Sequence, residues 1–285
     1  MSKQPEPDIK EGIEYWNTQP ASLDGVLGGL GSGSLPRVDA VGSRLFLLNI
    51  FPELCTVPSA LRPLSPSTPG YRTRALDVGA GIGRVTADVL LPLVSDVVLL
   101  EPVYHFVQEA LTRGRNSISQ HKRAWKGIAD KTKSVTILQG TLQSFHPTSP
   151  INTPDVKFLD RVGFCPPTGS DSDANSGFDV IWCQWCLGHL NDQDLVAFFQ
   201  RCHKALRNPD RSLIIVKENL CRDGDDGQGR TSFDEQDSSL TRSDGAWKSA
   251  FKSAGLHLIH EKVQGGFEEG LYPVKMLEHR LLYIK

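Results

Sequence analysis

A glycine-rich turn is the clearest chemical signal in this chain of 285 residues. The segment Ala75–Arg84 reads Ala-Leu-Asp-Val-Gly-Ala-Gly-Ile-Gly-Arg, the order of a strand, a tight turn and a helix start. Glycine lets a ligand approach the backbone closely because no Cβ stands in the way. The spacing Gly79-x-Gly81-x-Gly83 differs from the G-x-G-x-x-G pattern that holds a dinucleotide pyrophosphate.

An acidic residue strengthens this signal. Glu101 ends the next apolar run, where its carboxylate can accept hydrogen bonds from both hydroxyls of a ribose. The spacing of the glycines and the position of Glu101 together favour S-adenosylmethionine (AdoMet) over NAD as the cofactor. Asp77 could anchor the loop or reach the cofactor's ammonium group, and Arg84 could bind a ligand carboxylate. Plainer interpretations stay open: Glu101 as a helix cap, and Arg84 as an exposed arginine.

The elements that must position these residues alternate along the chain. Strands are expected at 74–78, 96–100, 135–139, 178–184 and 212–218, and helices at 82–93, 104–117, 192–207 and 239–254. Strands alternating with helices predict an α/β fold with a mostly parallel, doubly wound sheet. Two last runs, 256–263 and 275–283, predict an antiparallel hairpin at its edge.

Two parts are expected in this chain. Residues 1–70 form an N-terminal extension, with helices near 7–19 and 39–50 joined by a glycine-rich loop. Residues 71–285 form the catalytic domain. The stretch 147–177 is rich in Pro, Ser and Asp and is expected to be an inserted, mobile surface loop.

Composition excludes several classes of protein. The net charge of −2 argues against a general binder of nucleic acid or membrane surfaces. No apolar run reaches the roughly 20 residues of a membrane span, and the polar N-terminus lacks a secretory signal. The six cysteines suit a reducing compartment, cytoplasmic and also nuclear. Cys183-x-x-Cys186 could belong to a zinc site, but buried thiols fit its apolar surroundings better.

Several motifs resemble those of the protein α-N-terminal methyltransferases. Asp77–Arg84 is similar to the AdoMet loop of that family. Phe178–Leu190 contains the string Trp-x-Gln-Trp-x-x-Gly-His, which is far more specific. Further matches follow in the family's order: Tyr15-Trp16, Asp24–Gly29, Lys217–Asn219 and Phe233–Ser239. The resemblance implies a Rossmann-like class I methyltransferase with a seven-stranded sheet and an N-terminal helical extension.

The resemblance also implies a set of binding residues. Cofactor contacts are expected at Gly79, Arg84, Glu101, Leu142, Gln143 and Gln184. In the family, the target is a free N-terminal residue followed by proline and then lysine or arginine. The proline would pack on Trp185, and the basic residue would meet Asp234 and Asp237. The peptide channel would be lined by Tyr15, Leu27, Gly28 and Tyr272.

By the same resemblance, three residues would surround the amine: Asn219, His189 and Asp237. Methyl transfer needs a neutral nitrogen, and an α-amino group has a pKa of roughly 7.7–8.0, far below the ~10.4 of lysine. His189 and Asp237 could accept its proton, while Asn219 orients it. Plainer interpretations stay open: His189 could only satisfy a backbone carbonyl, and an aspartate could cap the helix expected at 239.

The sequence therefore predicts a monomeric enzyme that methylates protein N-termini of the form X-Pro-Lys/Arg with AdoMet. The alternatives are a small-molecule methyltransferase on the same fold and a binding module that kept the cofactor pocket. Glu101 and Glu218 stand where the family often has aspartate, and Leu30 where it has an aromatic residue. These departures bear on fine specificity more than on the reaction.

Overall fold

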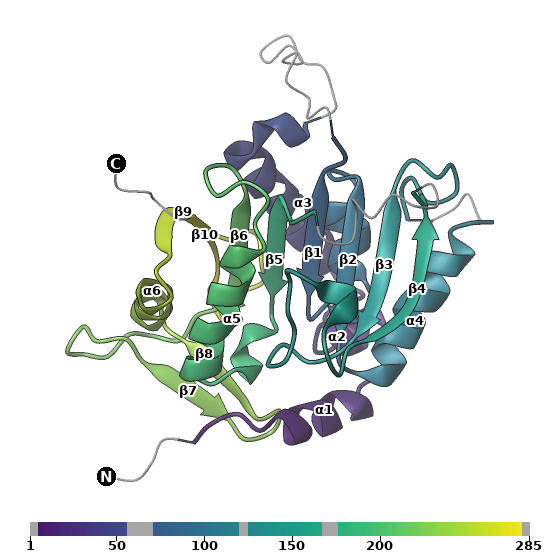
Figure 1. Cartoon of the computed structure of the whole chain (residues 1–285). Coiled ribbons are helices and arrows are strands. Elements are labelled where there is room, and N and C mark those ends of the chain that lie inside the picture. The colour runs from purple at the N-terminus through teal and green to yellow at the C-terminus, as the bar shows by residue number, and fades with distance from the viewer. Residues whose placement is uncertain (1–4, 56–70, 120–124, 167–175, 281–285) are drawn as a thin grey trace.

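The computed structural model describes residues 5–55, 71–119, 125–166 and 176–280. An eight-stranded sheet with the order β4-β3-β2-β1-β5-β6-β10-β9 crosses it, with helices on both faces (Figure 1). The strands are β1 (Arg74–Val78), β2 (Asp96–Glu101), β3 (Ser134–Gln139), β4 (Lys157–Gly163), β5 (Val180–Gln184), β6 (Leu213–Asn219), β9 (His257–Val263) and β10 (Val274–Arg280). The five strands β3, β2, β1, β5 and β6 are parallel. The predicted α/β fold with an antiparallel hairpin at its edge is confirmed.

The strand count of seven was wrong, and so was the assignment of the whole stretch 147–177 to a loop. β4 pairs antiparallel with β3 and adds an eighth strand. Val162 of β4 is buried against Gly114, where the absence of a side chain leaves room for it. Covering this apolar edge explains why a Pro- and Ser-rich stretch contains a strand. Residues 167–175 of it lie outside the described part.

Helices flank the sheet and form the N-terminal part. They are α1 (Ile9–Thr18), α2 (Leu23–Val26), α3 (Leu35–Ile50), α4 (Tyr104–Asn116), α5 (Asp192–Lys204) and α6 (Asp244–Ser253). Shorter turns are η1 (Pro52–Leu54), η2 (Thr86–Leu90), η3 (Pro150–Asn152) and η4 (Leu187–His189). The segment after the glycine loop, expected as an α-helix, contains the π-helical turn η2.

The helix expected at 239–254 was wrong in its first turn. Residues Ser239–Arg242 form β8, which pairs with β7 (Thr231–Asp234) in a two-stranded sheet of its own. The helix α6 starts only after Ser243, whose hydroxyl accepts a hydrogen bond from the Ala246 N–H. The residues 235–238 therefore form the turn of a hairpin.

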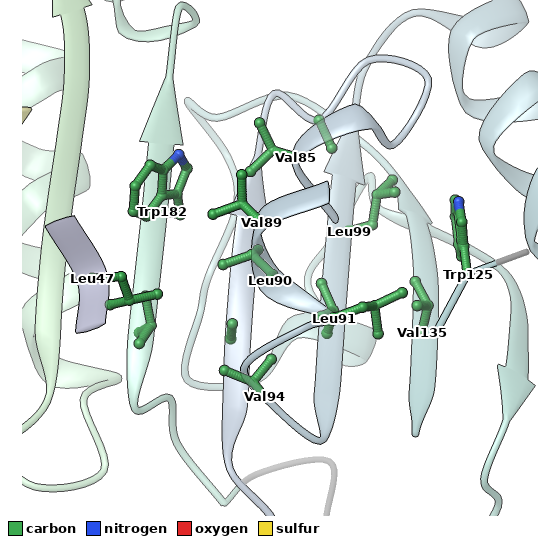
Figure 2. Packing of buried hydrophobic residues seen from close by; sticks show 14 of the residues in the cluster. Leu47, Val85, Val89, Leu90, Leu91, Val94, Leu99, Trp125, Val135 and Trp182 are labelled. Atoms are coloured by element: carbon green, nitrogen blue, oxygen red, sulfur yellow. The ribbon is translucent and has the colours of Figure 1, made fainter. Parts of the chain in front are cut away.

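A continuous apolar core joins α3 and η2 to one face of the sheet. Leu47 of α3 and Val89 and Leu90 of η2 are fully buried between these layers (Figure 2). Trp182 of β5 lies in the same cluster with 0% of its surface exposed, as expected of a core residue. Because helix and turn share this core, the N-terminal extension is part of the domain's packing.

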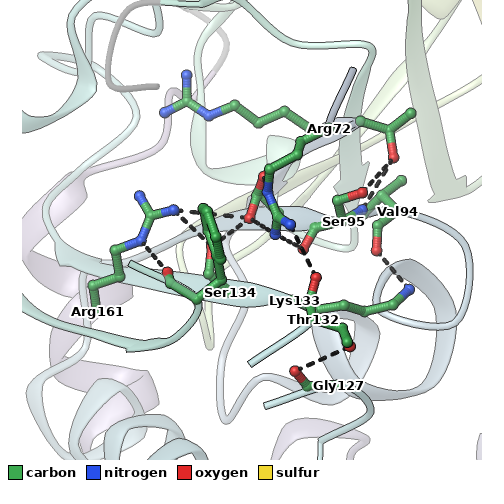
Figure 3. Close-up of polar contacts among 12 residues, drawn as sticks. Arg72, Val94, Ser95, Gly127, Thr132, Lys133, Ser134 and Arg161 are labelled. Carbon is green, nitrogen blue, oxygen red and sulfur yellow. Dashed lines mark hydrogen bonds and ion pairs between the residues drawn. The ribbon is translucent and has the colours of Figure 1, made fainter. Parts of the chain in front are cut away.

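A polar network closes the amino ends of the parallel strands. Arg72 donates to the Asp96 carboxylate at 2.8 Å, and the Ser134 hydroxyl donates to the same carboxylate at 2.6 Å. Arg161 of β4 then donates to Ser134 at 2.9 Å (Figure 3). Lys133 donates to backbone carbonyls beside this network, among them that of Val94 at 2.8 Å. The opposite, carboxyl end is the side where ligands bind in such sheets.

Candidate functional site

A cavity at the carboxyl ends of β1, β2 and β5 contains all the predicted cofactor contacts. The space between its lining residues is about 990 Å³, including the part open to solvent. Six of its lining residues are those expected from the sequence: Gly79, Arg84, Glu101, Leu142, Gln143 and Gln184. The glycine loop, Glu101 and the loop after β3 thus surround the same cavity.

Glu101 anchors the glycine loop to the helix that follows β2. Its carboxylate accepts the backbone N–H of Gly81 and that of Val103, both at 2.8 Å. Val103 is the N-cap of α4, so Glu101 bonds the backbone at the start of that helix, as its interpretation as a helix cap expects. Burial raises the pKa of Glu101 to about 7.

The glycines of the loop have backbone angles that other residues rarely adopt. Gly79, Gly81 and Gly83 all have positive φ, between 56° and 77°. A Cβ on Gly79 would lie 2.3 Å from the Cβ of Cys186. The loop therefore needs glycine both for its turn and for close packing on the segment after β5.

Arg84 is not an exposed arginine, since only 6% of its surface is accessible. It donates to Asp39 of α3, a residue with no exposed surface. Asp77 is also buried and accepts a hydrogen bond from the Thr86 hydroxyl, which fixes the start of η2. Burial raises the pKa of Asp77 to about 6. Arg84 and Asp77 both line the first cavity.

A second cavity of about 1120 Å³, partly open to solvent, adjoins the first. The two share the four lining residues Trp16, Val26, Trp185 and His189. Most of the predicted amine and peptide residues line it: Leu27, Gly28, Trp185, His189, Asn219, Asp237 and Tyr272. Two chambers with a common wall are thus formed at the carboxyl edge of the sheet.

Tyr15 and Asp234 line neither cavity but lie near the second one. Burial raises the pKa of the Tyr15 phenol, and the charges of Asp237 and Asp234 raise it further. Asp234 ends β7 and accepts the N–H of Gln236 at 2.8 Å within the hairpin turn. The interpretation of these aspartates as helix caps was wrong, because no helix begins at Ser239.

His189 is held by the N-terminal extension. Its Nε2 accepts a hydrogen bond from the indole N–H of Trp16 at 3.0 Å. Burial lowers the pKa of His189, although Asp237 and the backbone of Ser238 act in the opposite direction. The ring is therefore neutral at pH 7, and its Nε2 lone pair is already engaged.

Asp237 carries an unsatisfied oxygen. Its Oδ1 is buried and has no hydrogen-bond partner among the described residues. A buried carboxylate oxygen without a donor is unfavourable, so the arrangement favours a ligand that brings a donor or a positive charge.

Trp185 stands at the junction of the two cavities in an unusual conformation. It follows the last residue of β5 with φ of +53°. The Arg84 guanidinium lies 5.4 Å from its ring centroid, and the Phe267 ring lies 6.5 Å away. Backbone strain at such a place is typical of residues kept for function.

Two important residues were not assigned a role from the sequence. Trp16 was recognised only as part of a motif, and its bond to His189 becomes visible only in the fold. Asp39 was placed at the start of a helix that in fact begins at Leu35. With the correct start, Asp39 lies on the apolar stripe with Leu35 and Phe46, and a charge on such a stripe indicates a buried partner.

Three of the six cysteines lie in the core. Cys183, Cys186 and Cys202 are buried, and burial raises the pKa of each thiol. In the described part of the chain, no three His, Cys, Asp or Glu side chains gather as metal ligands. No helix there has the length and apolar character to cross a membrane.

Comparison with known proteins gives consistent matches. A profile described as AdoMet-dependent proline di-methyltransferase matches residues 4–280. Alpha N-terminal protein methyltransferase 1 of Schizosaccharomyces pombe is 35% identical over 272 residues, 95% of each chain. N-terminal Xaa-Pro-Lys N-methyltransferase 1-B of Xenopus laevis is 31% identical over 91% of this chain and 89% of its own. A solved SAM-dependent methyltransferase of Leishmania major aligns with a TM-score of 0.65 and 30% identity, covering 95% of this chain and 82% of that one.

Proposed function

The chain belongs to the AdoMet-dependent proline di-methyltransferase family, and on that premise we propose which chemistry each part of its site performs. It is an AdoMet-dependent methyltransferase that acts on the free α-amino group of proteins beginning X-Pro-Lys/Arg. AdoMet occupies the first cavity, and the substrate's N-terminal residues enter the second. AdoMet supplies an electrophilic methyl group on a sulfonium sulfur.

The observation that carries this proposal is the shared wall of the two cavities. A donor in one and an amine in the other approach each other past Trp185 and His189, which line both. Holding the nitrogen and the methyl group in line supplies most of the acceleration in a displacement of this kind. Gly79 and Glu101 line the first cavity and hold the cofactor there.

Asp237 is the residue that receives the ammonium form of the substrate. Its buried Oδ1 lacks a donor, and an ammonium group offers three. With an α-amine pKa of roughly 7.7–8.0, only a modest shift is needed to release the proton. His189 is neutral and its Nε2 accepts from Trp16, so it forms a fixed wall beside the amine while Asp237 takes up the proton. Asn219 offers a side-chain carbonyl to the same group.

The rest of the second cavity reads the peptide. The substrate's proline packs on the Trp185 indole, and Leu27, Gly28 and Tyr272 line its path. The basic third residue meets the negative charges of Asp234 and Asp237, which already act together on Tyr15. Charge pairing of this kind discriminates between peptides more than it adds affinity.

Transfer of a labelled methyl group to a synthetic peptide tests the activity directly. We expect labelling of a peptide that begins Ser-Pro-Lys, and none when its N-terminus is acetylated, because the acetyl group removes the nucleophilic lone pair. Mass spectrometry of the product would place the added mass on the first residue. Equal labelling of free and acetylated peptides would rule the proposal out.

The alternative is a small-molecule methyltransferase on the same fold. The double substitution Asp234→Asn/Asp237→Asn separates the two, because it removes both negative charges while keeping the size of each side chain. We expect kcat/KM for the peptide to fall by about 100-fold or more, since charged hydrogen bonds contribute ~1.5–3 kcal/mol each. A neutral acceptor would be spared. Unchanged peptide kinetics would favour the alternative.

We further propose that residues 1–70 act as an extension that completes the site of the catalytic part, 71–285. The chain works as a monomer in the cytoplasm and nucleus and binds neither nucleic acid nor membranes. Sedimentation of the purified protein and fractionation of cells test these points. A stable dimer, or recovery with membranes, would contradict them.

A further inference from the structure

A single carboxylate ties together two of the residues that line the first cavity. Asp39 of α3 has no exposed surface. One of its oxygens accepts a hydrogen bond from the Gln184 amide at 2.9 Å, and the other accepts from Arg84. The ammonium group of Lys217, also fully buried, forms an ion pair with it.

The four residues of this cluster, Asp39, Arg84, Gln184 and Lys217, do not all line the first cavity. Arg84 and Gln184 line the first cavity, whereas Asp39 and Lys217 do not. Burial alone would raise the Asp39 pKa, but the charges of Arg84 and Lys217 lower it below its ordinary value. Asp39 is therefore ionised at neutral pH and stands behind the cavity wall as a fixed acceptor.

Both cavity-lining side chains are immobilised by this contact. The Gln184 amide is held at its two ends, since its oxygen accepts from the Trp182 indole at 3.0 Å while its nitrogen donates to Asp39. Arg84 has five N–H donors, so the donors not used by Asp39 remain for a ligand. A free arginine would have to lose much rotamer freedom on binding, and a fixed one has already lost it on folding.

We propose that Asp39 is a positioning residue for the cofactor, which it serves by holding Arg84 and Gln184 in the geometry that AdoMet requires. Asp39 does not touch AdoMet itself. The inference rests on the proposed placement of AdoMet in the first cavity. It adds a member of the N-terminal extension to the machinery of the cofactor site.

The substitution Asp39→Asn tests the proposal, because it keeps the size of the side chain but weakens its hold on Arg84. Asp179→Asn is the matched control. Asp179 is as buried as Asp39 and accepts from Arg207 at 2.8 Å, but it precedes β5 at the amino end of the sheet. Both substitutions should lower the thermal stability, and only the one at 39 should affect the cofactor.

Calorimetry and steady-state kinetics provide the readouts. For Asp39→Asn we expect the Kd and KM for AdoMet to rise about tenfold or more, equivalent to at least ~1.4 kcal/mol, with kcat at saturating AdoMet within about threefold of wild type. For Asp179→Asn we expect both constants within about twofold of wild type. A purely structural role of Asp39 would make the two variants behave alike, and that result would overturn the proposal.

A second variant covers the case in which Asp39→Asn does not fold. Asp39→Leu/Lys217→Met replaces the fully buried Asp39–Lys217 ion pair by apolar groups, an exchange that folded proteins often tolerate, and leaves Arg84 at the cavity wall without its acceptor. It should show the same loss of AdoMet affinity, and a Kd within about twofold of wild type would overturn the proposal.

The wild-type protein and Glu101→Gln separate this inference from the proposed function. If the wild type binds no AdoMet, or Glu101→Gln binds it equally well, the cofactor placement fails and the inference fails with it. If those two behave as proposed while Asp39→Asn binds like Asp179→Asn, the inference alone fails.

Discussion

At the scale of single residues, the site is built from buried polar groups whose partners are fixed by the fold. Glu101 holds two backbone N–H groups, Asp39 holds Arg84, and Trp16 holds His189. The sequence singled out Glu101 and His189 as site residues, and the structure places both in the wall of the first cavity. It could not predict the pairing of Trp16 with His189 or of Asp39 with Arg84, because these residues lie far apart along the chain and meet only in the tertiary structure.

The pH dependence of cofactor binding follows from Glu101. Burial raises the pKa of this carboxyl to about 7, so it gains a proton as the pH falls through neutrality. In the proposed placement of AdoMet, the protonated group has one acceptor fewer for the ribose hydroxyls. We expect AdoMet affinity to fall as the pH is lowered from roughly 8 to 6.5, a range above the ordinary pKa of Glu. Calorimetry at several pH values measures this.

Glu101→Gln is the control for that experiment. An amide does not titrate, so its weaker affinity should vary less with pH than that of the wild type. The slope that remains measures the other buried groups that titrate in this range, Glu218 with a pKa of about 7 and Lys217 with a pKa of about 8. A wild-type protein whose affinity follows the same slope as Glu101→Gln would contradict this assignment of the pH effect.

At the scale of elements, a helix of the N-terminal extension covers the proposed amine site. In α1, Gly12 is buried, and a Cβ placed on it would lie 3.0 Å from Nδ1 of His189 and 3.4 Å from the Asp237 carbonyl. Asp8, the residue just before α1, caps the helix and donates its backbone N–H to the Ser238 hydroxyl. The hairpin turn and the helix thus determine each other's position.

The substitution Gly12→Ala tests this close packing. Alanine favours a helix by up to ~1 kcal/mol over glycine, so α1 itself should not be weakened. The added methyl group pushes on His189 and the turn. A misplacement of 1 Å can lower the rate of an enzyme on the order of 100-fold. For a shift of a few tenths of an ångström, we expect kcat/KM for the peptide to fall roughly tenfold.

Glu14→Ala on the exposed side of α1 is the matched substitution for that kinetic measurement. It should leave kcat/KM near the wild-type value. Equal activity of Gly12→Ala and Glu14→Ala would show that the contact with His189 has no effect on turnover.

Some strands could be predicted from the sequence and others could not. The strand Arg74–Val78 was predicted with its correct bounds because its apolar run and glycine turn are unambiguous. β8 was mistaken for the start of a helix, since a run of four residues is too short for its period to be judged. β4 was missed because pairing with β3, and not composition, determines its conformation.

At the scale of the whole molecule, the two ends of the sheet differ in how they are closed. The amino end is sealed by the network around Asp96 (Figure 3). The carboxyl end is covered by α1, which contacts the body mainly through a small apolar cluster around Phe106 and a few hydrogen bonds. The sequence predicted this extension but not which end of the sheet it covers.

Hydrogen exchange should reveal this asymmetry. Backbone amides of α1 should exchange much faster than those of β1 and β5, which are fully buried. AdoMet should slow the exchange in α1, since Gly12 and Trp16 line the proposed cofactor cavity. The amides around Asp96 serve as the internal reference and should not change. Protection of α1 equal to that of β1 without AdoMet would contradict this description.

The left-handed backbone conformation of Trp185 allows the contribution of its side chain to be tested by substitution with glycine. Replacing tryptophan by glycine normally alters both the ring and the freedom of the main chain. Here glycine would adopt the native backbone angles without strain, whereas a side chain in this region costs of order 1–3 kcal/mol. The loss of activity in Trp185→Gly would therefore reflect mainly the indole, because the native backbone angles stay accessible.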